Sequence, residues 1–216
     1  MKKVLVAVII CLGAQVVSAQ ISFGIKAGPN MSFLKYKVES ESQTYNWDGS
    51  RVGFQAGGVA QIGIAENFAI QPELLFLLKG ADKMKIQDLG DIEVTTKTFA
   101  IDMPITFVYR TNGFFGGIGP NLSFGVSSKL KVKGNDTEYD LYDTNNEAVF
   151  FSQKRFEVGA NVLAGYKLKS GLAFSLNFVQ GLTNASNANS EVDEDDAKIR
   201  MRSAYLGLSI GYFFGK

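Results

Sequence analysis

Apolar and polar residues alternate with a period of two along most of the chain. From Ile21 to Phe33 the odd positions are apolar, and the even positions are small or polar. The segment 203–214 shows the same alternation, with apolar residues at the even positions. Such alternation is typical of a β-strand with one apolar face, whereas helical periodicity is weak throughout. The pattern therefore predicts an all-β protein.

Six further segments of this kind lie between these two, which gives eight predicted strands. The six segments are 51–65, 67–79, 94–110, 113–133, 153–168 and 171–182. The connections alternate strictly in length. The short ones carry turn-forming residues and are 65–67, 111–113 and 169–171. The long polar ones are 36–50, 80–93, 134–152 and 183–197.

This alternation of connection lengths places all the long loops at one end of the fold and both termini at the other. Nothing in a soluble β-sandwich requires short and long connections to alternate. The pattern is typical of an antiparallel up-and-down transmembrane β-barrel with short periplasmic turns and long external loops. We therefore predict an eight-stranded barrel of this type in the bacterial outer membrane.

The main structural alternative is a soluble lipocalin-like barrel with its apolar face inside. An eight-stranded barrel has an interior just wide enough for side chains to fill. One face here is bulky, as at Phe99 and Phe107, and the other is small or polar, as at Gly117 and Asn121. Aromatic residues also gather at the short-turn end, as an interfacial girdle would: Phe68, Tyr109, Phe114, Tyr166, Tyr212 and Phe214. Both features favour an apolar face that points toward lipid.

The first 19 residues have the three regions of a signal peptide. Lys2 and Lys3 precede an apolar run, and Val17 to Ala19 form a small-residue cleavage site. We expect a signal peptide over 1–19 and the barrel domain over 20–216.

The only cysteine, Cys11, lies in the signal segment, and the chain has no histidine. The formal charge of +1 falls to −1 without the two lysines, so no charge bias indicates nucleic acid.

Two nearly identical hexapeptides interrupt the alternation with turn residues. GPNMSF begins at Gly28 and GPNLSF begins at Gly119. Proline has no N–H group to donate to a neighbouring strand, and a closed barrel has no free edge. We therefore predict a bulge or a ladder break at Pro29 and at Pro120.

Several strand segments resemble the PorT-like outer-membrane β-barrel family. They are GIKAGPNMSF at 24–33, PELLF at 72–76, IDMPITFVYR at 101–110 and the aromatic C-terminal strand. The resemblance covers essentially the whole mature chain and implies a small outer-membrane barrel. Some members of that family work with protein secretion machinery. The resemblance carries over no binding residue.

The lack of histidine argues against an enzyme, because hydrolases on small barrels need a base that titrates near neutral pH. A glycosidase with paired carboxylates remains a formal alternative. We assign no catalytic, cofactor or metal residue. The acidic run 191–196 has two interpretations, a calcium site or a solvated loop that shares divalent ions with lipopolysaccharide. The second is favoured, because the run lacks the glycine spacing of a calcium loop.

Tyr45 and Trp47 lie in the first predicted external loop. They are candidates for a partner contact, since interface hot spots favour these residue types. The alternative is that they are interfacial aromatic residues of the membrane.

Charged residues with the inward parity are predicted to form a polar network that closes the lumen. They are Lys26, Arg110 and Lys167 with Glu73, Asp102 and Glu157, and Asn121 and Asn161 share their parity. Unpaired charges in such a narrow interior would be costly, so they should pair and hydrogen-bond.

The whole pattern predicts a structural or interaction protein of the outer membrane. It would contact lipid and lipopolysaccharide, and it would bind a protein partner through the external loops or the periplasmic rim. An accessory role in protein secretion or surface assembly would fit. The alternative function is a small channel for ions or solutes.

Overall fold

The computed structural model describes residues 21–39, 44–86, 92–132, 138–143, 153–186 and 198–214. The predicted signal peptide and the acidic run 191–196 lie outside these residues. The described strands are β1 Ile21–Glu39, β2 Thr44–Gly63, β3 Phe68–Ile86, β4 Ile92–Thr111, β5 Phe114–Val132, β6 Glu138–Asp140, β7 Phe156–Lys167, β8 Leu172–Gly181 and β9 Lys198–Phe214.

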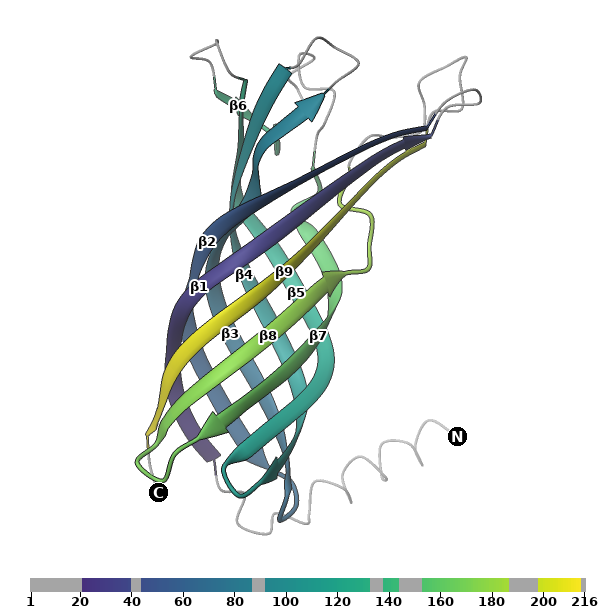
Figure 1. Ribbon diagram of the computed structural model, residues 1–216. Helices are drawn as coiled ribbons and strands as arrows, with labels where there is room; N and C mark the ends of the chain where they lie inside the picture. Colours follow the sequence, from purple (N-terminus) through teal and green to yellow (C-terminus); the bar gives the residue numbers. More distant parts are fainter. Residues whose placement is uncertain are drawn as a thin grey trace, which may run out of the picture.

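Eight long strands form one closed antiparallel barrel (Figure 1). Each pairs with its neighbours in the chain, β5 pairs with β7, and the β1–β9 ladder joins the two ends of the sequence. The short strand β6 adds to β5 outside the ring, where Lys129–Lys131 face Glu138–Asp140. The predicted all-β, eight-stranded up-and-down barrel is therefore confirmed.

The three short turns lie where the alternation predicted them. Asn112 and Gly113 have positive φ angles of 48° and 88°, and Gly171 has a φ of 93°. Glycine reaches this region without steric cost, and asparagine tolerates it better than most other residues. The N-terminal end of β1 lies on the same side of the barrel as these turns (Figure 1).

Two of the long loops are largely strand, which corrects the sequence analysis. The predicted loop 36–50 is replaced by β1 reaching Glu39 and β2 starting at Thr44. The predicted loop 80–93 is replaced by β3 reaching Ile86 and β4 starting at Ile92. These extensions project beyond the barrel (Figure 1). Both faces of a strand can be polar in water, so the period-two signal disappears there although the pairing continues.

The apolar face points outward. Phe23, Phe54 and Phe99 are 61%, 55% and 56% exposed, whereas Gln55 and Asn121 are buried in the interior. At the short-turn end, ring pairs form on the outer face, with Phe68–Tyr109 at 5.3 Å, Phe114–Tyr166 at 4.6 Å and Tyr212–Phe214 at 5.4 Å between centroids. The outer surface is thus an apolar belt with an aromatic rim, as a lipid-facing barrel requires.

Each proline keeps its pairing on one side and interrupts the ladder on the other. Pro29 faces Phe54 of β2, but its pairing with β9 is missing. Pro120 faces Ala160 of β7, but its pairing with β4 is missing. The register resumes unshifted beyond both gaps, so neither proline sits in a bulge. The predicted ladder break is confirmed, and it follows from the missing N–H group. Pro72 and Pro104 show the same one-sided gap, toward β2 and β3 respectively.

The glycine before each repeated proline lies against the backbone of the strand across the gap. A Cβ atom at Gly28 would overlap the carbonyl oxygen of Leu208, and one at Gly119 would overlap that of Ile105. Glycine is therefore required here by the close approach of the strands. The hexapeptide is used twice because it combines this contact with a one-sided ladder gap.

Replacing Gly119 with alanine should lower the free energy of unfolding by about 2 kcal/mol, because the added methyl group forces the strands apart. Urea titration of the protein in detergent micelles, read from heat-modifiable gel mobility, measures the change. Gly58→Ala is the matched control, since the nearest atom to its Cβ would be the Gly24 carbonyl oxygen at 4.0 Å. Equal losses in the two variants would contradict the close-approach explanation.

Candidate functional site

The interior of the barrel is the candidate site, because it gathers the charged side chains of the membrane region. Six of the eight predicted network residues are buried, and Asp102 is fully buried at 0% exposure. The six are Lys26, Glu73, Asp102, Asn121, Glu157 and Asn161. Arg110 and Lys167 are only partly buried and lie at the periplasmic mouth.

A chain of hydrogen bonds rises from the periplasmic mouth to the first ion pair. Arg110 Nη1 donates to Gln61 Oε1 at 3.1 Å, and Gln61 Nε2 donates to Gln71 Oε1 at 2.9 Å. Gln71 Nε2 then donates to Glu73 Oε1 at 2.8 Å. Lys26 Nζ lies 2.6 Å from Glu73 Oε2 and neutralises that carboxylate. The chain links β1, β2, β3 and β4 from the inside.

Amide side chains cross the lumen above this chain. Gln55 Nε2 on β2 donates to Asn177 Oδ1 at 3.0 Å and to Ser209 Oγ at 2.9 Å, on β8 and β9. Asn161 Nδ2 on β7 donates to Thr106 Oγ1 on β4 at 2.8 Å. Asn161 is therefore in the interior but contacts none of the predicted charged residues in these bonds.

The buried carboxylate of Asp102 is the best-satisfied charge in the lumen. Its Oδ1 accepts from Ser123 Oγ at 2.6 Å, and its Oδ2 accepts from Asn121 Nδ2 at 3.1 Å. Lys79 Nζ lies 3.7 Å from Asp102 Oδ1 and donates to Ser123 Oγ at 2.7 Å. Full burial with a cation and two donors is the arrangement that an ionised carboxylate needs away from water.

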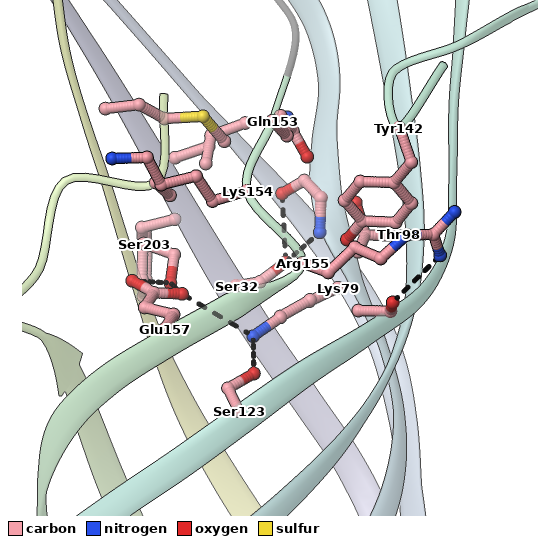
Figure 2. A pocket seen from close by; sticks show the side chains of 16 residues that line it. Ser32, Lys79, Thr98, Ser123, Tyr142, Gln153, Lys154, Arg155, Glu157 and Ser203 are labelled. Atoms are coloured by element: carbon pink, nitrogen blue, oxygen red, sulfur yellow. Dashed lines mark hydrogen bonds and ion pairs between the residues drawn. The ribbon is translucent and has the colours of Figure 1, made fainter. Parts of the chain in front are cut away.

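Lys79 also connects Asp102 to the second acid. Its Nζ lies 3.9 Å from Glu157 Oε2, and Glu157 accepts bonds from Ser203 Oγ at 2.7 and 2.9 Å. Figure 2 shows the lysine between Ser123 on one side and Glu157 on the other. Lys79 of β3 thus contacts β4, β5 and β7 through one ammonium group and is linked to β9 through Glu157, which makes it the centre of the network.

The sequence analysis did not assign Lys79 to the lumen. The sequence did contain the information, because Lys79 is six residues after Glu73 on the same strand and therefore faces the same side. Lys79 was missed because it is the last residue of the predicted strand 67–79, next to a predicted loop. The structure continues β3 to Ile86, and the inward parity continues with it.

The interior is also more apolar than predicted. Buried apolar residues form three clusters along the lumen, which include Phe115 and Phe213 in one, Leu75 and Leu77 in another and Leu34 and Met201 in the third. The run from Leu74 to Leu78 is apolar at both parities, so alternation could not separate its inward from its outward residues. The lumen is therefore a packed core in which ion pairs alternate with apolar clusters.

A turn folds over the external mouth, within the region 134–152 that was predicted to be a long external loop. Leu141 is fully buried, and Gln153 Nε2 donates to the hydroxyl oxygen of Tyr36 at 3.0 Å. The Arg155 guanidinium lies 4.5 Å from the centre of the Tyr142 ring. Burial raises the pKa of Tyr142 to about 12, so this phenol stays neutral. Figure 2 shows Tyr142, Gln153 and Arg155 among the residues that line a cavity of about 40 Å³. That volume holds roughly three water molecules.

Lys167 lies apart from the network, at the periplasmic mouth. Lys167 Nζ lies 4.9 Å from the centre of the Phe213 ring, and its ring contact replaces the carboxylate pairing that was predicted. Lys167 and Arg110 line an open cavity of about 320 Å³ at the periplasmic mouth. Tyr45 and Trp47 belong to β2 by their backbones and face Val38 and Tyr36. Their side chains lie outside the described residues.

In the part of the chain that the structure describes, no group of three or more acidic, histidine or cysteine side chains could hold a metal ion. No helix in the same residues is long and apolar enough to cross a membrane.

Replacing Asp102 with alanine should lower the free energy of unfolding by about 3 kcal/mol, because Lys79 would lose a fully buried partner. Asp102→Asn should cost less, since it can keep one hydrogen bond. Urea unfolding in micelles measures both. The control is Glu138→Ala, which breaks the exposed Lys129–Glu138 pair (2.8 Å) and should leave stability unchanged. An Asp102→Ala variant as stable as this control would show that the buried pair is not stabilising.

Solved structures with a similar fold are outer-membrane barrels. Neisserial surface protein A is 15% identical, with 89% of this chain and 97% of that chain covered and a TM-score of 0.48. Outer membrane protein OprG from Pseudomonas aeruginosa is 14% identical, with 92% and 98% covered and a TM-score of 0.47. A major outer membrane protein from Thermus thermophilus is 12% identical, with 90% and 100% covered and a TM-score of 0.46.

Among curated proteins, no relative matches this chain. The family described as "Outer membrane protein beta-barrel domain" matches residues 14–187, which is most of the sequence. Members of this family are located in the bacterial outer membrane. The closed barrel with its lipid-facing belt agrees with that match. The chain belongs to the outer membrane protein beta-barrel domain family.

Proposed function

We propose that this barrel is a structural or interaction protein of the outer membrane and does not conduct solutes. The observation that carries the proposal is the closed external half of the lumen. Lys79 joins Asp102 and Glu157 there, and the cavity above them has a volume of only about 40 Å³. A solute would have to break two buried ion contacts to pass, so the ends of the barrel are the surfaces left for function.

A protein partner would bind the projecting hairpins or the periplasmic rim. The β1–β2 and β3–β4 hairpins extend beyond the barrel (Figure 1). Tyr45 and Trp47 lie in the first of these hairpins, and their residue types suit a partner contact. Lipid and lipopolysaccharide would cover the belt, and nucleic acid is no partner of this chain.

Within the family, we assign the chain to the PorT-like group. The motifs at 24–33, 72–76 and 101–110 support this assignment. The assignment suggests an accessory role in protein secretion or surface assembly. Export would use the signal peptide over residues 1–19, with cleavage before Gln20.

An enzymatic role is not proposed. The chain has no histidine to serve as a base, and the buried acids Asp102 and Glu157 are both engaged by Lys79 and serine hydroxyls. No cofactor is needed for the proposed role.

A small channel is the second candidate, and one observation favours it. Both side-chain amide atoms of Asn30 are buried without a hydrogen-bond partner in the described part of the chain. Buried amide atoms are normally satisfied, so water is expected to reach them. A lumen that holds water at this level is a feature that a channel would need.

Conductance separates the two candidates. The purified protein in planar bilayers should show little or no steady conductance, because buried charges and the turn over the mouth close the lumen. A variant with Lys79, Asp102 and Glu157 all replaced by serine should leak more if it still shows heat-modifiable mobility. A stable wild-type channel of porin-like size would reject the closed-lumen proposal and establish the channel.

Trp47 tests the hairpin as a partner surface. Trp47→Ala should leave heat-modifiable mobility intact but should lose a protein captured by mild crosslinking in intact membranes. Trp47→Phe is the matched control and should keep most of the capture, because it retains an aromatic ring. Loss of heat-modifiable mobility in Trp47→Ala would instead assign the side chain a structural role.

A further inference from the structure

The external end of the β1–β9 ladder carries a cluster of positive charges on its outward face. Lys35 lies opposite Arg202, and Lys37 lies opposite Arg200. All four side chains line one groove with a volume of about 560 Å³, and we call this the basic groove. Phe33, Gln180 and Ala204 also line it, beside Tyr36 and Ser203.

The groove lies beside the end of β8. The β8–β9 ladder stops where Gln180 faces Ala204, while β9 continues beside β1 as far as Lys198 (Figure 1). Beyond the ladder, the connection after β8 still contacts β9, because Ala185 N donates to Met201 O at 3.1 Å and Met201 N donates to Asn184 Oδ1 at 2.8 Å. The side chains of Arg200 and Arg202, on either side of Met201, are exposed.

The charges of the basic groove are unbalanced within its own lining. Asp48 is the one carboxylate among the described lining residues, and its backbone lies opposite Lys35. Like charges directly opposite each other on neighbouring strands destabilise a sheet. The pairing of Lys35 with Arg202, next to Arg200, therefore indicates that an anion supplied from outside the described fold completes this surface.

The height of the groove in the membrane identifies the layer that supplies the anion. The outward positions of β1 from Phe23 to Phe33 are apolar, and the register places them beside Phe214 to Ala204 of β9. Ten residues at about 3.3 Å each, tilted by about 40°, span roughly 25 Å, which is the height of the apolar band of an outer-membrane barrel. Lys35 and Arg202 are the next outward positions, so they lie at the level of the external headgroups.

We propose that the basic groove binds the phosphate groups of a lipid headgroup in the outer leaflet. Arginine presents two parallel N–H donors to a phosphate, and lysine adds a point charge. Arg200 and Arg202 would hold the phosphate oxygens, while Lys35 neutralises charge from the neighbouring strand. The proposal rests on the orientation of the hairpins outward, but it does not depend on whether the lumen conducts.

The test uses the full-length mature protein in phosphatidylcholine nanodiscs with or without lipid A that carries two phosphates. Native mass spectrometry measures how much lipid A each protein retains across a titration. The wild type should retain it, and Arg200→Gln with Arg202→Gln should weaken retention at least tenfold, because two charge-assisted contacts are lost. Lys35→Gln on the facing strand should weaken it in the same direction.

The matched control removes two cations from another outward pair at the external end of the barrel. Lys97 and Lys129 lie opposite each other on β4 and β5, and Lys129 is already paired with Glu138. Lys97→Gln with Lys129→Gln should change retention less than twofold. Equal losses in this control and in the arginine variant would overturn the assignment to the basic groove. Heat-modifiable mobility confirms that every variant is folded before the comparison.

Two further probes identify the ligand chemistry. Lipid A without its phosphates should be retained no better by the wild type than by the arginine variant. Inorganic phosphate at the same concentration should not displace the intact lipid, since it lacks the anchoring acyl chains. Displacement by free phosphate, or undiminished retention of the dephosphorylated lipid, would overturn the proposal. Retention of lipid A by a protein that conducts would reject the closed lumen and leave the basic groove intact.

Discussion

The contacts of Lys79 constrain the rest of the barrel interior. One ammonium group lies within 4 Å of carboxylates on β4 and β7 and donates to a serine hydroxyl on β5, while a serine of β9 donates to the β7 carboxylate. Hydrogen-bonded ladders hold neighbouring strands, but only side chains can join strands across the lumen. Burying a cation in this place requires the surrounding acids, and burying the acids requires the cation. The buried lysine and the buried carboxylates are therefore stable in the interior only when both are present.

Close approach of the strands sets the second constraint. Around Gly28 and Gly119 the neighbouring backbone leaves no room for a Cβ atom, and the prolines that follow remove one ladder contact each. Proline is normally confined to sheet edges, and a closed barrel has none. The structure accommodates it by keeping full register on the other side of the strand. The repeated hexapeptide thus follows from backbone geometry in the wall, and it does not indicate a ligand site.

The wall of the barrel could be predicted from local pattern, and much of the site could not. Alternation shows that Phe99 faces lipid and Asn121 faces the lumen, because each strand in the membrane has an apolar lipid side and a more polar inner side. Beyond the membrane that contrast ends, so alternation alone predicts loops where the strands extend to Glu39 and Ile86. The placement of Lys79 between Asp102 and Glu157 depends on register between distant strands. Burial of Leu141 depends on how a connection folds back, and no local pattern encodes either.

The role of a charged residue in this fold depends on whether it faces the lumen or the outside, and on whether it lies within the membrane or above it. Lys26 and Lys35 lie on the same strand, nine residues apart, and therefore face opposite sides of the wall. Lys26 points inward at the level of the membrane, where it must have a partner, and Glu73 supplies one at 2.6 Å. Lys35 points outward above the apolar belt, between Arg202 of β9 and Asp48 of β2, where headgroup phosphates supply the remaining negative charge. The inward charges close the lumen, and the outward charges are left to recognise the membrane surface.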